Sequence, residues 1–264
     1  FQRVFMWLGD YRLIVAIIKS IEDRLNVEHD TQLAGVQSII LIEDNVKFYS
    51  SFLPLIYTEV INQSQRLISE GVNLTHKFLR MRARPKIILC TDYDEAWAHY
   101  EKYSSSILGI ISDLNFRKGG VRDPEAGLKF VRNVKAIHAD IPALLQSSSS
   151  EFAFQAEIMG AEFLQKGSPR LLHDLRDFIL NNFGFGDFIF RNPQGEILGR
   201  ASNLKALGEL LKTVPIESIV YHADRNHFSN WLKARTEFSL AHRLRPHRAQ
   251  DFGTPEDLRR FLVS

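Results

Sequence analysis

The chain has 264 residues, 45% of them hydrophobic and 24% charged, with a formal net charge of +2. This length allows one large core or two modest ones, and the near balance of charge argues neither for nor against a nucleic-acid partner. A single cysteine, Cys90, excludes a disulfide framework and suits a reducing cytoplasm, and no signal peptide or bilayer-spanning apolar stretch is visible.

The first thirty residues predict one strand and one helix. Residues 1–9 are typical of a strand, and the spacing of apolar residues from Tyr11 to Asn26 predicts an amphipathic helix. One strand and one helix cannot close a core. Because the chain opens in mid-strand at Phe1, we expect it to be a segment of a longer protein. Residues 31–38 are polar and predict a linker.

A buried strand then ends in two adjacent acids. Residues 39–42 are apolar and are followed directly by Glu43 and Asp44. A continuous apolar run of this kind is typical of a strand buried on both faces of a parallel sheet. Ligands gather at the carboxyl ends of such strands, although a pair of acids could also cap the next helix.

The next segment is longer than one ordinary helix. Residues 46–82 have a helical pattern with a break at residues 71–73, so we expect an extended helix followed by a second, short one. The run KIILC, residues 86–90, predicts a strand, and residues 92–103 predict a helix.

Three further strands end in residues that can carry chemistry. Residues 107–113 end in Asp113, residues 141–147 end in Ser147, and residues 161–166 end in Lys166. Helices are predicted between and after them at residues 128–138, 152–159 and 171–182. Five alternating strand and helix units predict a doubly wound α/β fold.

The strands are followed, in this order, by two acids, a third acid, a hydroxyl and a lysine. This arrangement resembles the receiver domain of two-component response regulators. The resemblance covers residues 39–184 and implies a flavodoxin-like, five-stranded parallel sheet in the order 2-1-3-4-5. It also implies that residues 1–30 are the last strand and helix of an upstream receiver-like domain, with Gly9 and Asp10 where the lysine would be. A plain strand and helix added to the main sheet is an equal alternative.

The resemblance implies a phosphoacceptor and a Mg²⁺ site. Asp113 would accept the phosphoryl group. Asp44 and Asp113 would bind the ion directly, Glu43 would act mainly through water, and the backbone carbonyl of Asn115 would supply one more oxygen. Three carboxylates this close repel one another unless a cation intervenes, and Mg²⁺ prefers oxygen ligands.

Three other residues take roles by the same resemblance. Lys166 and Ser147 would bind phosphoryl oxygens, and Phe163, three residues before the lysine, would be the switch aromatic. Ser148 to Ser150 offer alternatives to Ser147, and Phe163 could simply be a core residue. The chain departs from the family pattern at Gly167, because receivers commonly follow the lysine with a proline in a cis peptide; we expect a trans bond here.

Residues 185–264 predict a smaller α+β extension. A hairpin is expected around residues 192–195, a helix from Ser202 to Thr213, further helices to residue 244, and a last helix from Thr254. With 12 Lys and Arg against 9 Asp and Glu, and no tight helix-turn-helix, the segment gives little support for a nucleic-acid partner. We expect a connector or interaction module.

The histidines of this extension suggest two other readings. His222, His227, His242 and His247 lack the paired spacing and the cysteines of most metal sites. His227 could be a phosphorylatable histidine, but the neighbouring Phe228 and Trp231 indicate a helix packed on an apolar surface.

We therefore expect a cytoplasmic signalling switch that is phosphorylated by a histidine kinase or phosphotransfer protein and is not otherwise an enzyme. Its output would reach neighbouring domains of the same chain through the face formed by the fourth helix, fifth strand and fifth helix, which could also hold a homodimer. The alternative is an unphosphorylated, receiver-shaped scaffold. A Mg²⁺-dependent phosphohydrolase is disfavoured because Asn115 stands where a second acid would be needed.

Overall fold

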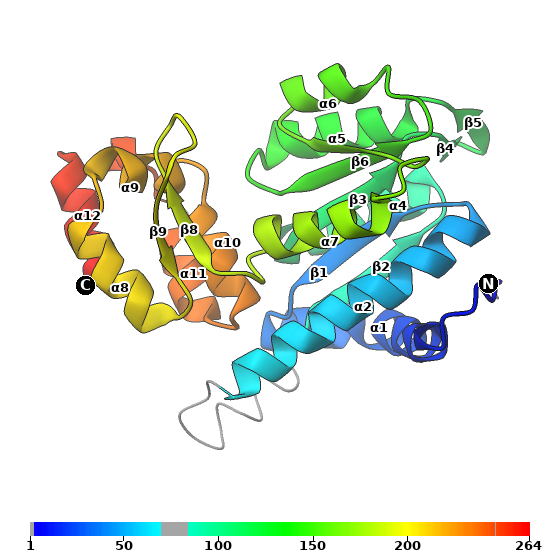
Figure 1. Ribbon diagram of the computed structural model, residues 1–264, viewed down its shortest axis with the longest axis horizontal. Helices are drawn as coiled ribbons and strands as arrows, with labels where there is room; N and C mark the ends of the chain where they lie inside the picture. The colour runs from blue at the N-terminus through cyan, green and yellow to red at the C-terminus, as the bar shows by residue number, and fades with distance from the viewer. Residues whose placement is uncertain (1–2, 70–83, 246) are drawn as a thin grey trace. The chain divides into compact units, whose positions relative to one another are not determined.

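The computed structural model describes residues 3–69, 84–245 and 247–264. The chain divides into two compact units, Phe1–Asn182 and Phe183–Ser264, and each is described by itself (Figure 1).

The first unit is built on a five-stranded sheet in the order β2-β1-β3-β6-β7. Every neighbouring pair in it is parallel. The strands are β1 (Ser38–Ile42), β2 (Lys86–Cys90), β3 (Ile107–Asp113), β6 (Ala143–Ser147) and β7 (Glu162–Gln165). Numbered within the sheet alone, this order is 2-1-3-4-5, which confirms the predicted doubly wound α/β fold.

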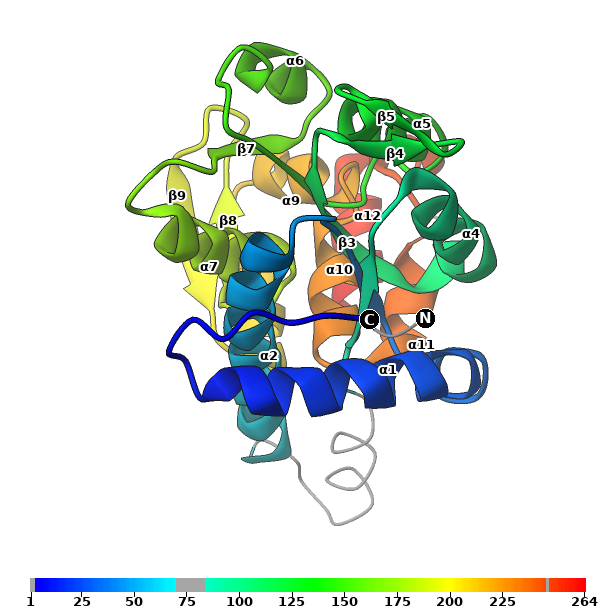
Figure 2. The same ribbon diagram turned by 90° about the vertical axis from the view of Figure 1, so that its right-hand side faces the viewer.

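Helices cover both faces of the sheet. Helices α4 (Tyr93–Tyr103) and α5 (Ala126–Ile137) lie on one face, and α2 (Val46–Ser69) and α7 (Leu171–Asn182) lie on the other (Figures 1 and 2). The short helix α6 (Ala153–Ile158) precedes β7 and packs against it. All residues of β1, β2 and β3 are buried, because helices on both sides leave no strand face to solvent.

The N-terminal segment differs from the prediction. Residues 3–10 form no strand, and the helix α1 (Arg12–Ala34) is eight residues longer than expected at its C-terminal end. It ends at Gly35, which has the left-handed φ of 64° that favours glycine. Helix α1 therefore occupies half of the segment expected to be a linker, residues 31–38, and packs against α2 and β2.

The N-terminal segment covers the outer edge of β2, the first strand of the sheet. The carboxylate of Asp23 on α1 is fully buried and accepts hydrogen bonds from the Ile87 amide and the Tyr57 hydroxyl, both 2.9 Å long. It also pairs with the guanidinium of Arg84. The Arg3 guanidinium donates to the carbonyl of Leu89 (2.6 Å). Two edge groups of the strand, the Ile87 amide and the Leu89 carbonyl, are therefore bound by side chains rather than by another strand.

The long helix after β1 is confirmed as far as it is described. Helix α2 spans 24 residues and contains Pro54. The predicted break at residues 71–73 and the second short helix lie outside the described residues.

A small hairpin follows β3. It consists of β4 (Phe116–Lys118) and β5 (Val121–Asp123), joined by Gly119 and Gly120, which have φ of 58° and 79°. Two consecutive positive φ angles are the requirement of a tight two-residue hairpin turn, and glycine meets it without strain.

The second unit is a hairpin packed on a group of helices. Strands β8 (Phe188–Arg191) and β9 (Ile197–Ala201) pair antiparallel, which confirms the predicted hairpin. The helices are α8 (Leu204–Thr213), α9 (Ile216–Ala223), α10 (His227–Ala234), α11 (Phe238–Leu244) and α12 (Pro255–Val263). The helix α8 begins two residues after the predicted start at Ser202 and is capped by Asn203, and Thr254 caps α12.

Aromatic residues form the core of the second unit. Phe188 stacks on Phe228 with ring centroids 4.9 Å apart, and the Trp231 indole donates to the carbonyl of Gly186 (3.1 Å). The Arg235 guanidinium lies 3.5 Å from the centre of the Trp231 ring and donates to the same carbonyl (2.9 Å). Phe228 and Trp231 are therefore core residues.

We predict that Gly127→Ala unfolds or strongly destabilises the first unit. Gly127, in the first turn of α5, donates its amide to the carbonyl of Leu114 (3.0 Å), and a Cβ would lie 2.1 Å from the carbonyl oxygen of Asp113. The helix or the strand end must shift, at a cost of about 3 kcal/mol or more in the free energy of unfolding measured by urea denaturation.

The matched control is Gly167→Ala, because a Cβ at Gly167 meets nothing within 4 Å. Its free energy of unfolding should stay within about 0.5 kcal/mol of wild type. Equal stability of the two variants would contradict the close approach of α5 to β3.

Candidate functional site

The end of β1 delivers Glu43 and Asp44. The Glu43 amide donates to the carbonyl of Cys90 (3.0 Å), which continues the ladder with β2 by one residue. Glu43 Oε1 accepts from the Asn45 amide (3.0 Å), and the Asn45 side chain accepts from the Lys47 amide at the start of α2 (3.0 Å). Glu43 is fully buried, whereas the side chain of Asp44 is 20% exposed.

The end of β3 places Asp113 beside them. Asp113 is the last residue of the strand and pairs with Gln146 of β6. The Leu114 amide donates to the Gln146 carbonyl (3.1 Å), so the chain remains in register one residue past the strand. One carboxylate oxygen each of Glu43, Asp44 and Asp113 lies within 4.8 Å of the others.

Lys166 directly follows β7, the edge strand of the sheet, and its side chain reaches the same group of acids. Its amide donates to the carbonyl of Ser147 (2.8 Å), which fixes its backbone at the end of β6 and β7. Its Nζ lies 2.6 Å from Glu43 Oε2 and 2.8 Å from Asp113 Oδ1, and the side chain is 5% exposed. The Nζ also lies 4.4 Å from the centre of the Phe48 ring.

Burial changes the charge of the acids. Desolvation raises the pKa of Glu43 to about 7, an effect that Lys166 opposes and Asp113 reinforces. Desolvation also raises the pKa of Asp44, and the Arg122 guanidinium opposes that increase. Two of the three neighbouring acids therefore have a raised pKa. A cluster of this kind favours the binding of a further positive charge.

The residues fit a Mg²⁺ ion. All three acids offer hard oxygen ligands at one edge of the sheet, and a divalent cation would relieve the repulsion that a single lysine leaves. Asn115 is exposed and lies in the bend between β3 and β4, two residues past Asp113. Asp44 and Asp113 would bind the ion directly, and Glu43 would act mainly through water.

Two predicted residues lie on β6 and β7. Ser147, the last residue of β6, is half-buried, and its Oγ accepts from the amide of Ser149 (3.2 Å). Its strand partner is Gln165, next to Lys166, so its hydroxyl is placed at the same sheet edge. Phe163 is half-buried and packs on the core beneath α4 and α5. The bond between Lys166 and Gly167 is trans, as expected.

One contact of this site does not follow from the local sequence pattern. Arg122 on β5 forms an ion pair with Asp44 Oδ2. Gly119 and Gly120 stand between two short runs, and a Gly-Gly pair in such a place is the signal of a hairpin that would carry Arg122 back toward the strand end. Its ion-pair partner is 78 positions away in sequence, which the local pattern does not show.

Other titratable clusters have structural explanations. Cys90, Glu95 and His99 lie together, but Glu95 accepts from Arg3 (2.6 Å) and from the Thr91 amide (2.9 Å). On α7, His173 and Asp177 form an exposed pair one helical turn apart. Neither arrangement brings a buried acid and a cation together as the sheet edge does.

The histidines of the second unit do not form a metal cluster in the part of the chain that is described. His222 Nε2 accepts from the Arg191 amide (2.8 Å), and its Nδ1 lies 2.8 Å from Nδ1 of His227. Burial, with His227 and nearby arginines, lowers the pKa of His222 to about 3, so the ring is neutral. It serves as a buried hydrogen-bond partner.

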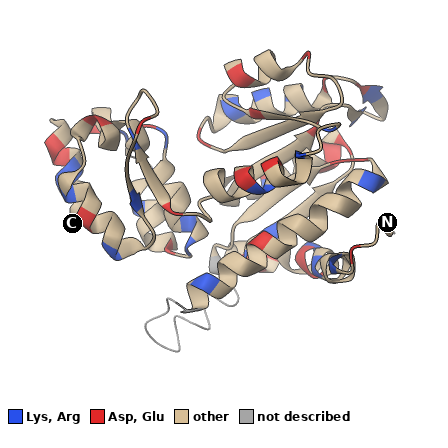
Figure 3. Cartoon of the chain, in the orientation of Figure 1, with Lys and Arg blue, Asp and Glu red and all other residues tan. Residues whose placement is uncertain are grey.

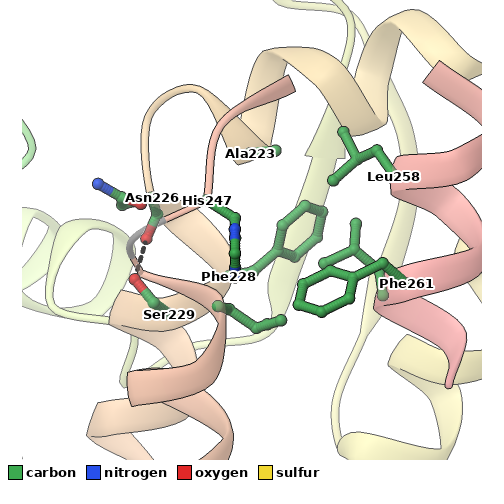
Figure 4. A pocket seen from close by; sticks show the side chains of 9 residues that line it. Ala223, Asn226, Phe228, Ser229, His247, Leu258 and Phe261 are labelled. Carbon is green, nitrogen blue, oxygen red and sulfur yellow. Dashed lines mark hydrogen bonds between the residues drawn. The ribbon is translucent and has the colours of Figure 1, made fainter. Parts of the chain in front are cut away.

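His247 lines a pocket in the second unit (Figure 4). The other lining residues are mainly apolar, including Leu258 and Phe261, and Ser229 Oγ is bound to the carbonyl of Asn226 (3.0 Å). The pocket therefore has few polar groups with which to orient a ligand.

The helices of the second unit carry charges of both signs. Acidic and basic residues both occur on α8 and on α12 (Figure 3). No described helix combines the length and apolarity that crossing a bilayer requires.

We predict that Glu43 makes the first unit less stable as pH rises. Because burial raises the folded-state pKa from 4.5 to about 7, the folded protein keeps a proton that the unfolded chain loses. In chelator-treated protein, the free energy of unfolding of wild type relative to Glu43→Gln should therefore fall as pH rises from 4.5 to 7, by on the order of 3 kcal/mol. Urea denaturation from pH 4 to 8 measures it.

The control is Glu157→Gln, which removes an exposed carboxylate from α6. Its difference from wild type should stay flat over the same range. A flat difference for Glu43→Gln would show that Glu43 ionises as readily in the folded protein as in the unfolded chain.

No family model matches the sequence, and no curated protein matches it either. Several solved structures are similar to it, of which two are described. One is a response regulator receiver domain protein from Clostridium thermocellum, with 17% identity, a TM-score of 0.40, and coverage of 56% of this chain and 94% of that one. The other is the phosphorylated cyanobacterial phytochrome response regulator RcpA, with 15% identity, a TM-score of 0.35, and coverage of 62% and 99%. Both of these structure neighbours are response regulators.

Proposed function

We propose that the first unit is a response-regulator receiver whose Asp113 accepts a phosphoryl group in the presence of Mg²⁺. One observation carries the proposal: the Lys166 amine lies 2.8 Å from Asp113 Oδ1 and 2.6 Å from Glu43 Oε2, beside a cluster of three carboxylates. A buried lysine held against two acids at the carboxyl edge of a parallel sheet is a site for binding a phosphoryl group next to a cation.

In the proposed reaction, a carboxylate oxygen of Asp113 attacks the phosphorus of the donor. A new bond forms between oxygen and phosphorus, the bond between phosphorus and the donor atom breaks, and the donor leaves with that electron pair. Because Lys166 contacts Oδ1, we assign the attack to Oδ2. Bound Mg²⁺ would neutralise charge on the transferred group.

The other residues bind and orient the group. The Lys166 ammonium can exchange its contact with Asp113 for one with a phosphoryl oxygen, since a lysine is a flexible point charge. The hydroxyl of Ser147 lies at the end of the neighbouring strand and would donate to a second oxygen. In this scheme the protein has no substrate other than the phosphodonor. Its one further reaction is the hydrolysis of its own phosphoryl group.

The signal would leave through the face formed by α6, β7 and α7. A phosphoryl group adds about −1.5 to −2 charge, which draws Ser147 toward it and gives Phe163 room to turn inward. Phe154 and Ile158 on α6 are 70% and 69% exposed, so this face has an apolar surface for a partner. We propose that a histidine kinase or phosphotransfer protein supplies the phosphoryl group and that a neighbouring domain responds.

The second candidate is a receiver-shaped scaffold that is not phosphorylated. The ion pair between Arg122 and Asp44 favours it, because Asp44 already has a cationic partner. Phosphorylation separates the two candidates.

We predict that incubation with Mg²⁺ and acetyl phosphate adds the mass of one phosphoryl group, and that Asp113→Asn abolishes the gain because an amide cannot form the acyl phosphate. Intact-protein mass spectrometry measures it. Asp187→Asn, which changes an exposed acid in the second unit, should gain the mass as wild type does. No gain in wild type supports the scaffold, and a gain that persists in Asp113→Asn places the phosphoryl group elsewhere.

We also predict that Asp44→Asn weakens Mg²⁺ binding about tenfold or more, because it replaces a charged oxygen ligand with a neutral amide. Isothermal titration calorimetry with MgCl₂ measures the dissociation constant. Asp187→Asn again serves as the control and should bind as wild type does. An unchanged constant in Asp44→Asn would remove Asp44 from the metal site.

A further inference from the structure

The hairpin β4–β5 is firmly anchored beside the candidate site. Phe116, at its base, is fully buried in the core of the first unit. At its tip, the Gly119 amide donates to Asp94 Oδ2 on α4 (2.9 Å), and the Lys118 ammonium lies 4.3 Å from the centre of the Tyr93 ring. The backbone of the hairpin is therefore held in place from both ends.

The returning strand is fixed as well. Asp123, the last residue of β5, pairs with Lys129 of α5 through contacts of 2.8 and 3.0 Å. Arg122 precedes it, and its guanidinium contacts Asp44 Oδ2. The side chain of Arg122 is 55% exposed and that of Asp44 only 20%. The anchored backbone thus aims a partly solvated cation at one of the three clustered acids.

We propose that Arg122 is an internal counter-cation for Asp44 that a divalent metal ion must displace in order to bind. This inference rests on the proposed function, because it concerns the metal site of the same receiver. A guanidinium and a divalent ion on one carboxylate repel each other, and a hard ion takes that carboxylate as a direct ligand.

Displacement needs no movement of the backbone. More than half of the Arg122 side chain already faces water, so the guanidinium can swing into solvent while the hairpin keeps its other contacts. An ion pair this exposed is weak, which is what a displaceable partner requires. The expected effect on metal affinity is accordingly a few-fold rather than many orders of magnitude.

The hairpin itself provides a matched control. Arg117 lies directly opposite Arg122 in the β4–β5 register and is also exposed. Substituting either arginine by glutamine removes one positive charge from the same hairpin. The difference between the two variants therefore reports the contact with Asp44 rather than the general field of the hairpin.

The test is isothermal titration calorimetry with MgCl₂ on the full chain, comparing wild type, Arg122→Gln and Arg117→Gln. We expect Arg122→Gln to bind Mg²⁺ about threefold or more tighter than Arg117→Gln. A smaller difference, or weaker binding by Arg122→Gln, overturns the inference; the latter would mean that Arg122 positions Asp44 for the metal. Circular dichroism of each variant verifies folding.

Failure of the inference can be told apart from failure of the proposed function. If wild type binds Mg²⁺ and is phosphorylated by acetyl phosphate, but the two variants bind alike, only the role of Arg122 is wrong. If neither wild type nor either variant binds Mg²⁺ and none is phosphorylated, both are wrong. Binding by Arg122→Gln alone would support the role of Arg122 strongly.

Discussion

The ion pairs of the Lys166 amine with Glu43 and Asp113 hold the candidate site together. Placing three acids at one sheet edge, two of them buried, is costly, and one ammonium within 2.8 Å of the two buried acids offsets part of that cost. Lys166 only partly compensates for the burial of Glu43, because the pKa of Glu43 remains near 7 even with this partner. A site poised in this way responds to any further charge that arrives, whether that charge is a metal ion or a phosphoryl group.

Much of this site could be predicted from the sequence because parallel strands have a simple signature. A strand buried on both faces is a continuous apolar run, and its carboxyl end meets those of its neighbours at one edge of the sheet. Glu43, Asp44 and Asp113 lie at the ends of such runs, whereas Lys166 follows the partly exposed edge strand β7; the structure brings all four together. The fold followed from the same runs with the helices between them.

The rest depends on contacts that local patterns do not encode. The apolar periodicity of α1 predicted the helix, but not that Leu13, Ala16 and Val27 would be buried while Ile14, Ile18 and Leu25 stay exposed. Which stripe of a helix is covered depends on the surface it meets, here α2 and the edge strand β2. The pairing of Arg122 with Asp44 likewise joins distant positions, and the arrangement of the second unit follows from aromatic packing among Phe188, Phe228 and Trp231.

The contacts of Asp23 and Arg3 with β2 have a consequence for where the first unit begins. These two side chains take the places that a sixth strand would fill, one accepting from the Ile87 amide and the other donating to the Leu89 carbonyl. Without them, each molecule in solution would offer a bare, apolar strand as a template on which another copy could add its own. Residues before β1 thus belong to the folding unit and cover this edge of its sheet, whatever their ancestry.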